Sequence, residues 1–408
     1  MPRGLPTRIL QKAAGIFLVC GAIAACATPR AQFTAAQQEN AQLPGFPHVR
    51  VFADSQGAKL GTGSAKLESQ KDFAFLALSG GGADGAYGAG ILNGWSASQQ
   101  RPEFTVVSGA STGALMAPFA FLGPAYDGTI KEIYTAGYAE QFVKSANVTN
   151  VIFNAGLISA GSANSIISQF ITRRLLDDIA REHRKGRRLY VVTTNLDAQR
   201  PVLWDMGAIA ASDRPDAASV FTEILTASAS FPGVFSPVLI DVEADGHRFT
   251  EMHVDGETTD PIFVAPEKVL KSLAVTSSAS AHKSIYVLIN TKLEPTFEVT
   301  ENTPLQVPSR AIFTLTKTER RNSILAAYDF ARRNGFKFNL AYLPRDSRTK
   351  ARSSSTPATC DRCSNMDMRL AAPDRRGDHR RRRCIEASRA PPESAPLHRP
   401  VCRLRRQQ

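Results

Sequence analysis

The sequence predicts an α/β fold with a mostly parallel central sheet. An unbroken apolar run at residues 73–78 is typical of a strand buried on both faces of such a sheet, and glycines and a helical stretch follow it. A second short strand at 104–107 is again followed by an apolar helical run. With 408 residues and 43% hydrophobic content, the chain is long and apolar enough to form a substantial core.

The glycine-rich stretch after the first strand allows two interpretations. Gly80, Gly82 and Gly85 satisfy G-x-G-x-x-G, the fingerprint of a dinucleotide-binding turn, and Glu103 lies about where a ribose-binding acid would fall. Alternatively, Gly80, Gly81 and Gly82 form a loop whose N–H groups hold an oxyanion, since backbone amides approach a substrate closely where no Cβ intervenes.

The second strand leads into a motif that favours the oxyanion interpretation. Gly109, Ser111 and Gly113 form G-x-S-x-G between the strand at 104–107 and the next helical run. This is the pattern of a nucleophile elbow, in which small flanking residues allow a sharp turn and leave the serine hydroxyl exposed at a helix N-terminus. The sequence therefore predicts a serine hydrolase.

The glycine loop followed by G-x-S-x-G resembles the patatin-like phospholipases over roughly residues 72–344. Members have G-G-G-x-[RK]-G as the oxyanion loop and a serine–aspartate dyad, whose aspartate lies in D-G-[GA]; the counterpart here is Asp255-Gly256. The resemblance implies a three-layer α/β/α hydrolase that cleaves acyl esters of lipids, plausibly phospholipids, through an acyl-enzyme. It implies no metal or organic cofactor.

The resemblance assigns roles to individual residues. Ser111 is the expected nucleophile, Asp255 the base that takes its proton, and the N–H groups of Gly80, Gly81 and Gly82 the oxyanion donors. The remaining motif positions, where the backbone must turn or pack closely, are Gly85, Gly109, Gly113 and Gly256.

Two positions depart from the family pattern. Asp84 stands where the family has Arg or Lys, so any help from that cation is missing. Glu257 replaces the small residue of D-G-[GA] and brings a second carboxylate close to the base.

Three alternatives remain open. One is a histidine-based triad, for which His253 and His282 are the nearest candidates after Ser111. The others are a nucleotide-binding protein that uses the glycine loop and a catalytically inactive envelope lipoprotein. An active-site serine probe distinguishes these classes.

The N-terminal residues resemble an export signal. Residues 1–25 have a basic start and an apolar stretch, and Ile23-Ala24-Ala25-Cys26 resembles the bacterial lipobox, which predicts lipidation of Cys26; the alternative is an ordinary signal peptide. Ala27 rather than aspartate follows the cysteine, which favours the outer membrane facing the periplasm. Residues 26–70 are expected to be a tether with one short strand at 48–52, and residues 71–344 the catalytic domain.

The C-terminal segment has a different composition. Residues 345–408 carry 17 Lys and Arg against 7 Asp and Glu, so most of the net charge of +12 lies there. They also hold four of the six cysteines: Cys360, Cys363, Cys384 and Cys402. A zinc site or a nucleic-acid patch would be the usual interpretations, but the loss of apolar periodicity and the excess of arginine favour a lost reading frame, so no nucleic-acid partner is predicted. The oligomeric state is left open.

Back-translation supports the lost frame. Bacterial family members often end in a segment like F-D-P-x-Y-M-R-x-L-F, which supplies a final helix. Codons that encode residues 355–364, read one position earlier after a T from Ser354, can spell F-D-P-G-Y-M-R-S-L-F. We therefore expect the segment after about Arg345 to contribute nothing to function.

Overall fold

The computed structural model describes residues 30–55, 72–138, 156–264, 282–303 and 306–344. The chain divides into two compact units, residues 1–370 and 371–408, and all described residues belong to the first. Cys26 and residues 345–408, on which the lipidation and frameshift predictions rest, lie outside the described residues.

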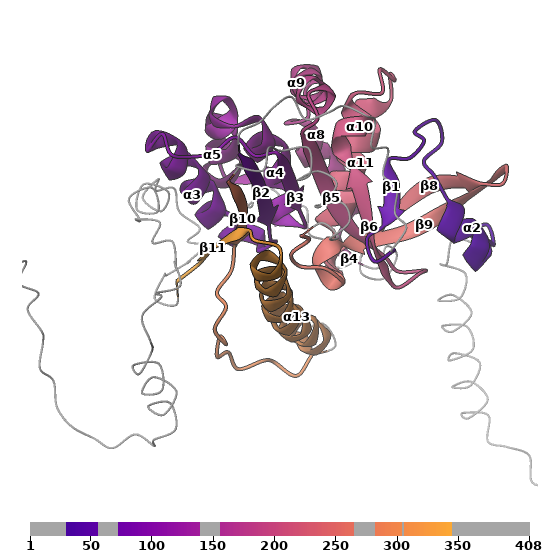
Figure 1. Ribbon diagram of the computed structural model, residues 1–408. Helices are drawn as coiled ribbons and strands as arrows, with labels where there is room; N and C mark the ends of the chain where they lie inside the picture. The colour runs from indigo at the N-terminus through magenta and orange to yellow at the C-terminus, as the bar shows by residue number, and fades with distance from the viewer. Residues whose placement is uncertain (1–29, 56–71, 139–155, 265–281, 304–305, 345–408) are drawn as a thin grey trace, which may run out of the picture. The chain divides into compact units, whose positions relative to one another are not determined.

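Within these ranges the central feature is a nine-stranded sheet (Figure 1). Its main path runs β1-β6-β5-β3-β2-β10-β11, and β9 pairs with β5 and with β8. The strands in chain order are β1 (Arg50–Phe52), β2 (Phe73–Leu78), β3 (Val106–Gly109), β5 (Arg188–Asn195), β6 (Arg200–Asp205), β8 (Val238–Ala244), β9 (His247–Asp255), β10 (Lys283–Ile289) and β11 (Lys337–Tyr342). A separate parallel pair joins β4 (Gly156–Ile158) and β7 (Gly233–Phe235).

The middle of the sheet is parallel, as the buried apolar strand predicts. Strands β11, β10, β2, β3 and β5 all run in the same direction, whereas β6, β1, β8 and β9 make antiparallel additions. All six residues of β2 are buried. Because successive side chains point to opposite faces, Ala74, Leu76 and Leu78 join one core and Phe73, Phe75 and Ala77 the other.

Helices cover both faces of the sheet, so the fold has three layers. The helices are α2 (Ala35–Asn40), α3 (Gly85–Ala97), α4 (Thr112–Leu122), α5 (Asp127–Thr135), α8 (Ala160–Ser168), α9 (Arg173–Arg184), α10 (Met206–Ala210), α11 (Ala217–Ser228) and α13 (Gln306–Arg333). Residues of α3, α4, α5, α9, α10 and α11 build the larger core on one face. On the other face α13 packs with residues 262–264, and Figure 1 shows α13 across the sheet from α3 and α4.

The short strand predicted at residues 48–52 is present as β1, but the residues from 34 up to that strand pack onto the fold instead of forming a tether. Thr34 and Gln37 form a capping box at the start of α2, and β1 pairs antiparallel with β6 at the edge of the sheet. Five apolar side chains of this segment are buried in the larger core: Ala41, Leu43, Phe46, Val49 and Phe52. Its many Gln and Ala residues suggest a linker by composition, but these spaced apolar residues suffice to pack it onto the fold.

No helix in the described part of the chain is both long enough and apolar enough to cross a membrane.

Candidate active site

Ser111 lies in a sharp turn between β3 and α4. Its backbone has φ +54° and ψ −128°, a conformation that costs a residue with a Cβ about 1–3 kcal/mol, and its side chain is buried after the carboxyl end of β3. The flanking glycines make the turn possible: a Cβ on Gly113 would lie 2.3 Å from the carbonyl oxygen of Leu78, and one on Gly109 would lie 2.4 Å from that of Gly113. The elbow therefore has the tight geometry that its motif predicts.

Ser228, at the end of α11, fixes the backbone of the elbow through hydrogen bonds. The N–H of Ser111 donates to the Ser228 hydroxyl at 3.1 Å, and that hydroxyl donates to the carbonyl of Val192 on β5 at 2.6 Å. No sequence motif assigns a role to Ser228. Its position in a small-residue run after a helix carries no signal of this contact.

Asp255 reaches Ser111 because two strands share one edge of β5. Strand β3 occupies the first part of that edge and ends with Gly109 opposite Val191, and β9 occupies the next part and ends with Asp255 opposite Thr193. Strand β6 takes the other edge of β5, so β3 and β9 meet end to end. The last residue of β9 therefore lies beside the elbow that follows β3.

The Asp255 side chain is fully buried, which sets its acid–base behaviour. Its Oδ1 accepts a hydrogen bond from the N–H of Glu257 at 2.8 Å, and Oδ2 has no hydrogen-bond partner among the described residues. Burial, and then the nearby Glu257 carboxylate, raise the pKa of Asp255 well above its ordinary value, while the neighbouring Ser111 hydroxyl and Arg320 lower it. Such a carboxylate is a stronger base than an exposed one.

The start of the glycine loop after β2 is fixed by hydrogen bonds to Asn290, which follows β10. The Asn290 side-chain amide donates to the carbonyl of Ser79 at 2.6 Å, and its backbone N–H donates to the Ser79 hydroxyl at 3.0 Å. A side chain at Gly81 has no room, because its Cβ would lie 2.8 Å from Asn290. An asparagine at the carboxyl end of a parallel strand next to β2 is a signal from which this contact could have been predicted.

The three loop amides differ from one another, which the sequence analysis did not predict. The N–H of Gly80 donates to Oε1 of Glu257 at 3.0 Å, so this amide is already engaged. No hydrogen bond from the Gly81 or Gly82 amide is made within the described ranges, and Gly82 adopts φ +55° in an exposed position. The Thr112 hydroxyl, which donates to the carbonyl of Gly82 at 3.1 Å, ties this end of the loop to the elbow.

The histidines of the alternative triad make other contacts. The ring of His253 is fully buried, with Nδ1 2.9 Å from the Thr193 hydroxyl and Nε2 3.2 Å from Glu251. Burial lowers the pKa of His253, and both of its ring nitrogens have partners other than Ser111. His282 is an exposed residue whose ring pairs with Asp72. Neither histidine contacts the elbow.

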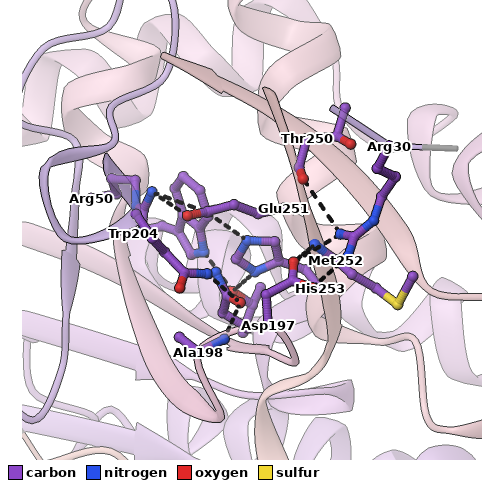
Figure 2. Close-up of polar contacts among 12 residues, drawn as sticks. Arg30, Arg50, Asp197, Ala198, Trp204, Thr250, Glu251, Met252 and His253 are labelled. Atoms are coloured by element: carbon purple, nitrogen blue, oxygen red, sulfur yellow. Dashed lines mark hydrogen bonds and ion pairs between the residues drawn. The ribbon is translucent and has the colours of Figure 1, made fainter. Parts of the chain in front are cut away.

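His253 belongs to a buried polar cluster that holds β9 in place (Figure 2). Arg50 on β1 pairs with Glu251 on β9 at 3.0 Å, with side chains 2% and 0% exposed. The indole N–H of Trp204 donates to the Thr193 hydroxyl at 2.7 Å, which completes the chain of contacts to His253. The N-terminal segment thus packs against the strand that carries Asp255.

The contacts around the loop also bear on nucleotide binding. Glu103 is largely exposed and pairs with Arg187 at 3.1 Å. A carboxylate occupies the Gly80 amide, which in a dinucleotide-binding turn would face a phosphate, and two anions do not share one donor. This arrangement disfavours a pyrophosphate at the glycine loop.

An apolar pocket begins one helical turn from Ser111. The N–H of Leu115, which lines the pocket, donates to the carbonyl of Ser111 at 3.2 Å, and Leu225 lines it from α11, one turn before Ser228. The pocket has about 370 Å³ of empty space, part of it open to solvent. Its lining residues are Leu115, Phe119, Ile133, Tyr138, Ile166, Ile167, Phe170, Ile171 and Leu225.

Among comparisons with known proteins, the informative result is a match to one family model. A search of curated proteins finds no match. Among solved structures, VipD from Legionella pneumophila aligns with a TM-score of 0.30 and 13% identity, over 72% of this chain and 65% of that one, so the alignment spans less than two thirds of VipD. Residues 76–266 match the family model described as patatin-like phospholipase. The region that contains Ser111 and Asp255 therefore belongs to the patatin-like phospholipase family.

Proposed function

We propose that this protein hydrolyses acyl esters of lipids, with Ser111 as the nucleophile and Asp255 as the general base. Family membership supports a lipid acyl hydrolase in general. The observation that carries the assignment of the dyad is the end-to-end meeting of β3 and β9, which puts a buried carboxylate oxygen without a partner beside the elbow serine.

The residues support a two-step reaction. The unpartnered Oδ2 of Asp255 accepts the proton of the Ser111 hydroxyl as Oγ attacks the ester carbonyl carbon, and the carbonyl π electrons move onto oxygen. The free amides of Gly81 and Gly82 are the donors for this oxyanion, and losing one such donor costs other enzymes about 3 kcal/mol. The tetrahedral species then expels the alcohol, which takes the proton from Asp255, and leaves an acyl-serine. Water activated by Asp255 hydrolyses the acyl-serine in the same way.

The apolar pocket supports an acyl chain as the group that enters the site. It is lined entirely by apolar and aromatic side chains, as most small-ligand sites are. Leu115 lies one turn after Ser111 on α4, so the pocket begins within one helical turn of the proposed nucleophile. Bulky substitutions at its far side, such as Ile167→Trp, should reduce turnover of long-chain esters more than that of short ones.

Fluorophosphonate labelling combined with hydrolysis of a short p-nitrophenyl ester tests the dyad. Ser111→Ala should abolish both signals, and Asp255→Asn should abolish turnover while the circular dichroism spectrum stays unchanged. His282→Ala is the matched control and should keep most of the activity, because the His282 ring is exposed and pairs with the exposed Asp72 rather than with Ser111. Labelling that persists in Ser111→Ala would exclude Ser111 as the nucleophile.

A further inference from the structure

Glu257 fills the position after Asp255-Gly256 where related sequences have a small residue, and its carboxylate has two partners. Oε1 accepts from the N–H of Gly80 at 3.0 Å and from Nη2 of Arg320 at 2.7 Å, with both side chains 6% exposed. A Cβ at Gly80 would lie 2.5 Å from both the Glu257 carboxylate and Cβ of Ser111. Glu257, the glycine loop and the nucleophile are thus in direct contact.

Arg320 comes from α13, the helix on the opposite face of the sheet from the elbow helix. Besides Glu257, it donates from Nη1 to the Thr291 hydroxyl at 2.8 Å. Thr291 follows Asn290, the residue that fixes Ser79 at the start of the loop. The Arg320 guanidinium therefore bonds to Glu257, which holds Gly80, and to Thr291, next to Asn290, which holds Ser79.

The loop consequently has one fixed amide and two free ones. Because the Gly80 N–H is engaged by Glu257, the peptide planes that follow it are held with the Gly81 and Gly82 amides unpaired within the described ranges. We propose that Glu257 is a positioning residue for the oxyanion loop, and that Arg320 on α13 holds it there, so that the placement of α13 controls the alignment of the oxyanion donors. This inference rests on the proposed function and assigns a role to a residue outside the dyad.

The charges of the pair act on the same site. The charged groups facing Glu257 are Asp255 at the end of β9 and Arg320 on α13, and Lys317 lies close to Arg320 on the same helix. Glu257 raises the pKa of Asp255 and Arg320 lowers it. Removing the charge of Glu257 should therefore lower the pKa of Asp255, and removing the charge of Arg320 should raise it.

The experiment measures kcat, KM and the pH dependence of fluorophosphonate labelling for single variants. Glu257→Ala, which removes the acceptor, should lower kcat about 100-fold with little change in KM, since a displacement of about 1 Å in a catalytic group costs that much. Glu257→Gln keeps an acceptor oxygen for Gly80 and should retain more activity than Glu257→Ala. In Glu257→Gln the acid limb of the pH–labelling profile should shift to lower pH, and in Arg320→Met it should shift to higher pH.

Arg333→Met is the matched control, because Arg333 forms an exposed pair with Asp329 at the C-terminal end of α13 and should change neither kcat nor the pH profile. A rise in kcat in Glu257→Ala would mean that the carboxylate blocks the oxyanion site, and would overturn the inference. Acid limbs that shift in the same direction in both variants, or not at all, would also overturn it. If the unmodified protein is neither labelled nor active, the proposed function itself fails, so the two failures are distinguishable.

Discussion

Asp255 combines the two properties that a serine-activating carboxylate needs, a free oxygen and a raised proton affinity. Oδ1 is held by the Glu257 amide, and Oδ2 is left for the nucleophile. Burial without a full set of hydrogen bonds costs stability, and active sites are where such costs are found. In the proposed site a serine, a carboxylate and oxyanion amides act together, and no imidazole contacts Ser111 among the described residues.

The raised pKa of Asp255 has a measurable consequence. Only the deprotonated carboxylate accepts a proton, so kcat/KM should fall as the pH drops below the folded-state pKa, and the midpoint should lie well above 3.8, the ordinary value for aspartate. A pH profile of the labelling rate from pH 4 to 9 checks this, with circular dichroism at each pH to separate unfolding. A flat profile down to pH 4 would contradict the role of Asp255 as base.

The motif residues and the Ser111–Asp255 pair were predicted from the sequence, but the contacts that Glu257 makes with Gly80 and Arg320 were not. Ser111 and Gly113 are two positions apart in the chain, so a local pattern specifies their turn. Glu257 and Arg320 lie 63 residues apart, and no local pattern reveals that they pair across the site. For the same reason the sequence predicted three equivalent loop amides, whereas a distant carboxylate makes Gly80 differ from the other two.

At the scale of elements, the site depends on how strand ends are brought together. The strand at 73–78 was predicted with its correct bounds, and the second strand lies two residues later than expected, at Val106–Gly109. The position of β9 was not predictable, because it is set by pairing with β5, a strand distant in the sequence, in the part of its edge that β3 leaves free. The short strand predicted at 48–52 is present as β1, but the prediction of a tether was wrong for the residues from 34 up to that strand, since composition does not reveal tertiary packing.

The close packing of α4 against β2 predicts that Gly113→Ala is strongly destabilising. The new Cβ would lie 2.3 Å from the backbone carbonyl of Leu78, and overpacking of this kind typically costs about 1–3 kcal/mol. Urea denaturation should show that loss, together with loss of serine labelling. Gly128→Ala on α5 is the control: no atom lies within 4 Å of the added Cβ, and alanine in a helix should stabilise by up to about 1 kcal/mol. Equal effects of the two substitutions would refute the packing argument.

The pair between β1 and β9 gives a second prediction at this scale. Arg50→Met removes the guanidinium that pairs with the buried Glu251 and leaves only the His253 ring, whose pKa burial lowers, as its partner; breaking a buried pair in this way typically costs about 3–5 kcal/mol. The matched control is Arg173→Met, which removes an exposed pair with Asp177 and should cost less than about 0.5 kcal/mol. Guanidinium denaturation compares the two variants. An Arg50→Met protein as stable as the parent would mean that the N-terminal segment does not support β9.

At the scale of the whole molecule, we propose that Cys26 anchors the enzyme to a bacterial envelope. Arg30 pairs with Asp197, so the chain joins the fold only a few residues after the predicted lipidation site. Because this spacer is short, lipid chains on Cys26 would hold the domain close to the membrane surface. Each buried methylene of those chains would strengthen the anchoring by about 0.8 kcal/mol. In detergent partitioning, Cys26→Ser should move to the aqueous phase. Cys20→Ser, within the expected signal peptide, is the control. Equal partitioning of wild type and Cys26→Ser would exclude the anchor.

The last prediction concerns the end of the chain and rests on where apolar surface is exposed. Among the described residues, most of the exposed large apolar side chains lie after residue 296, and Leu315 and Leu325 of α13 are 69% and 66% exposed. Strand β11 is at the edge of the sheet, and its Tyr342 is also exposed. Surfaces of this kind are normally covered. The segment spelled by the shifted frame has the aromatic and aliphatic residues to cover them.

Resequencing codons 340–366 tests this directly, and we expect the frame to read F-D-P-G-Y-M-R-S-L-F. A protein carrying that ending should unfold at higher urea concentration than the present chain, whereas a chain stopped after Pro344 should match the present chain in activity and stability. Buried apolar area is the reason: at about 25 cal/mol per Å², even a few covered side chains contribute several kcal/mol. If resequencing returns the printed sequence and removal of residues 345–408 abolishes activity, the basic segment has a function of its own and the lost-frame interpretation is wrong.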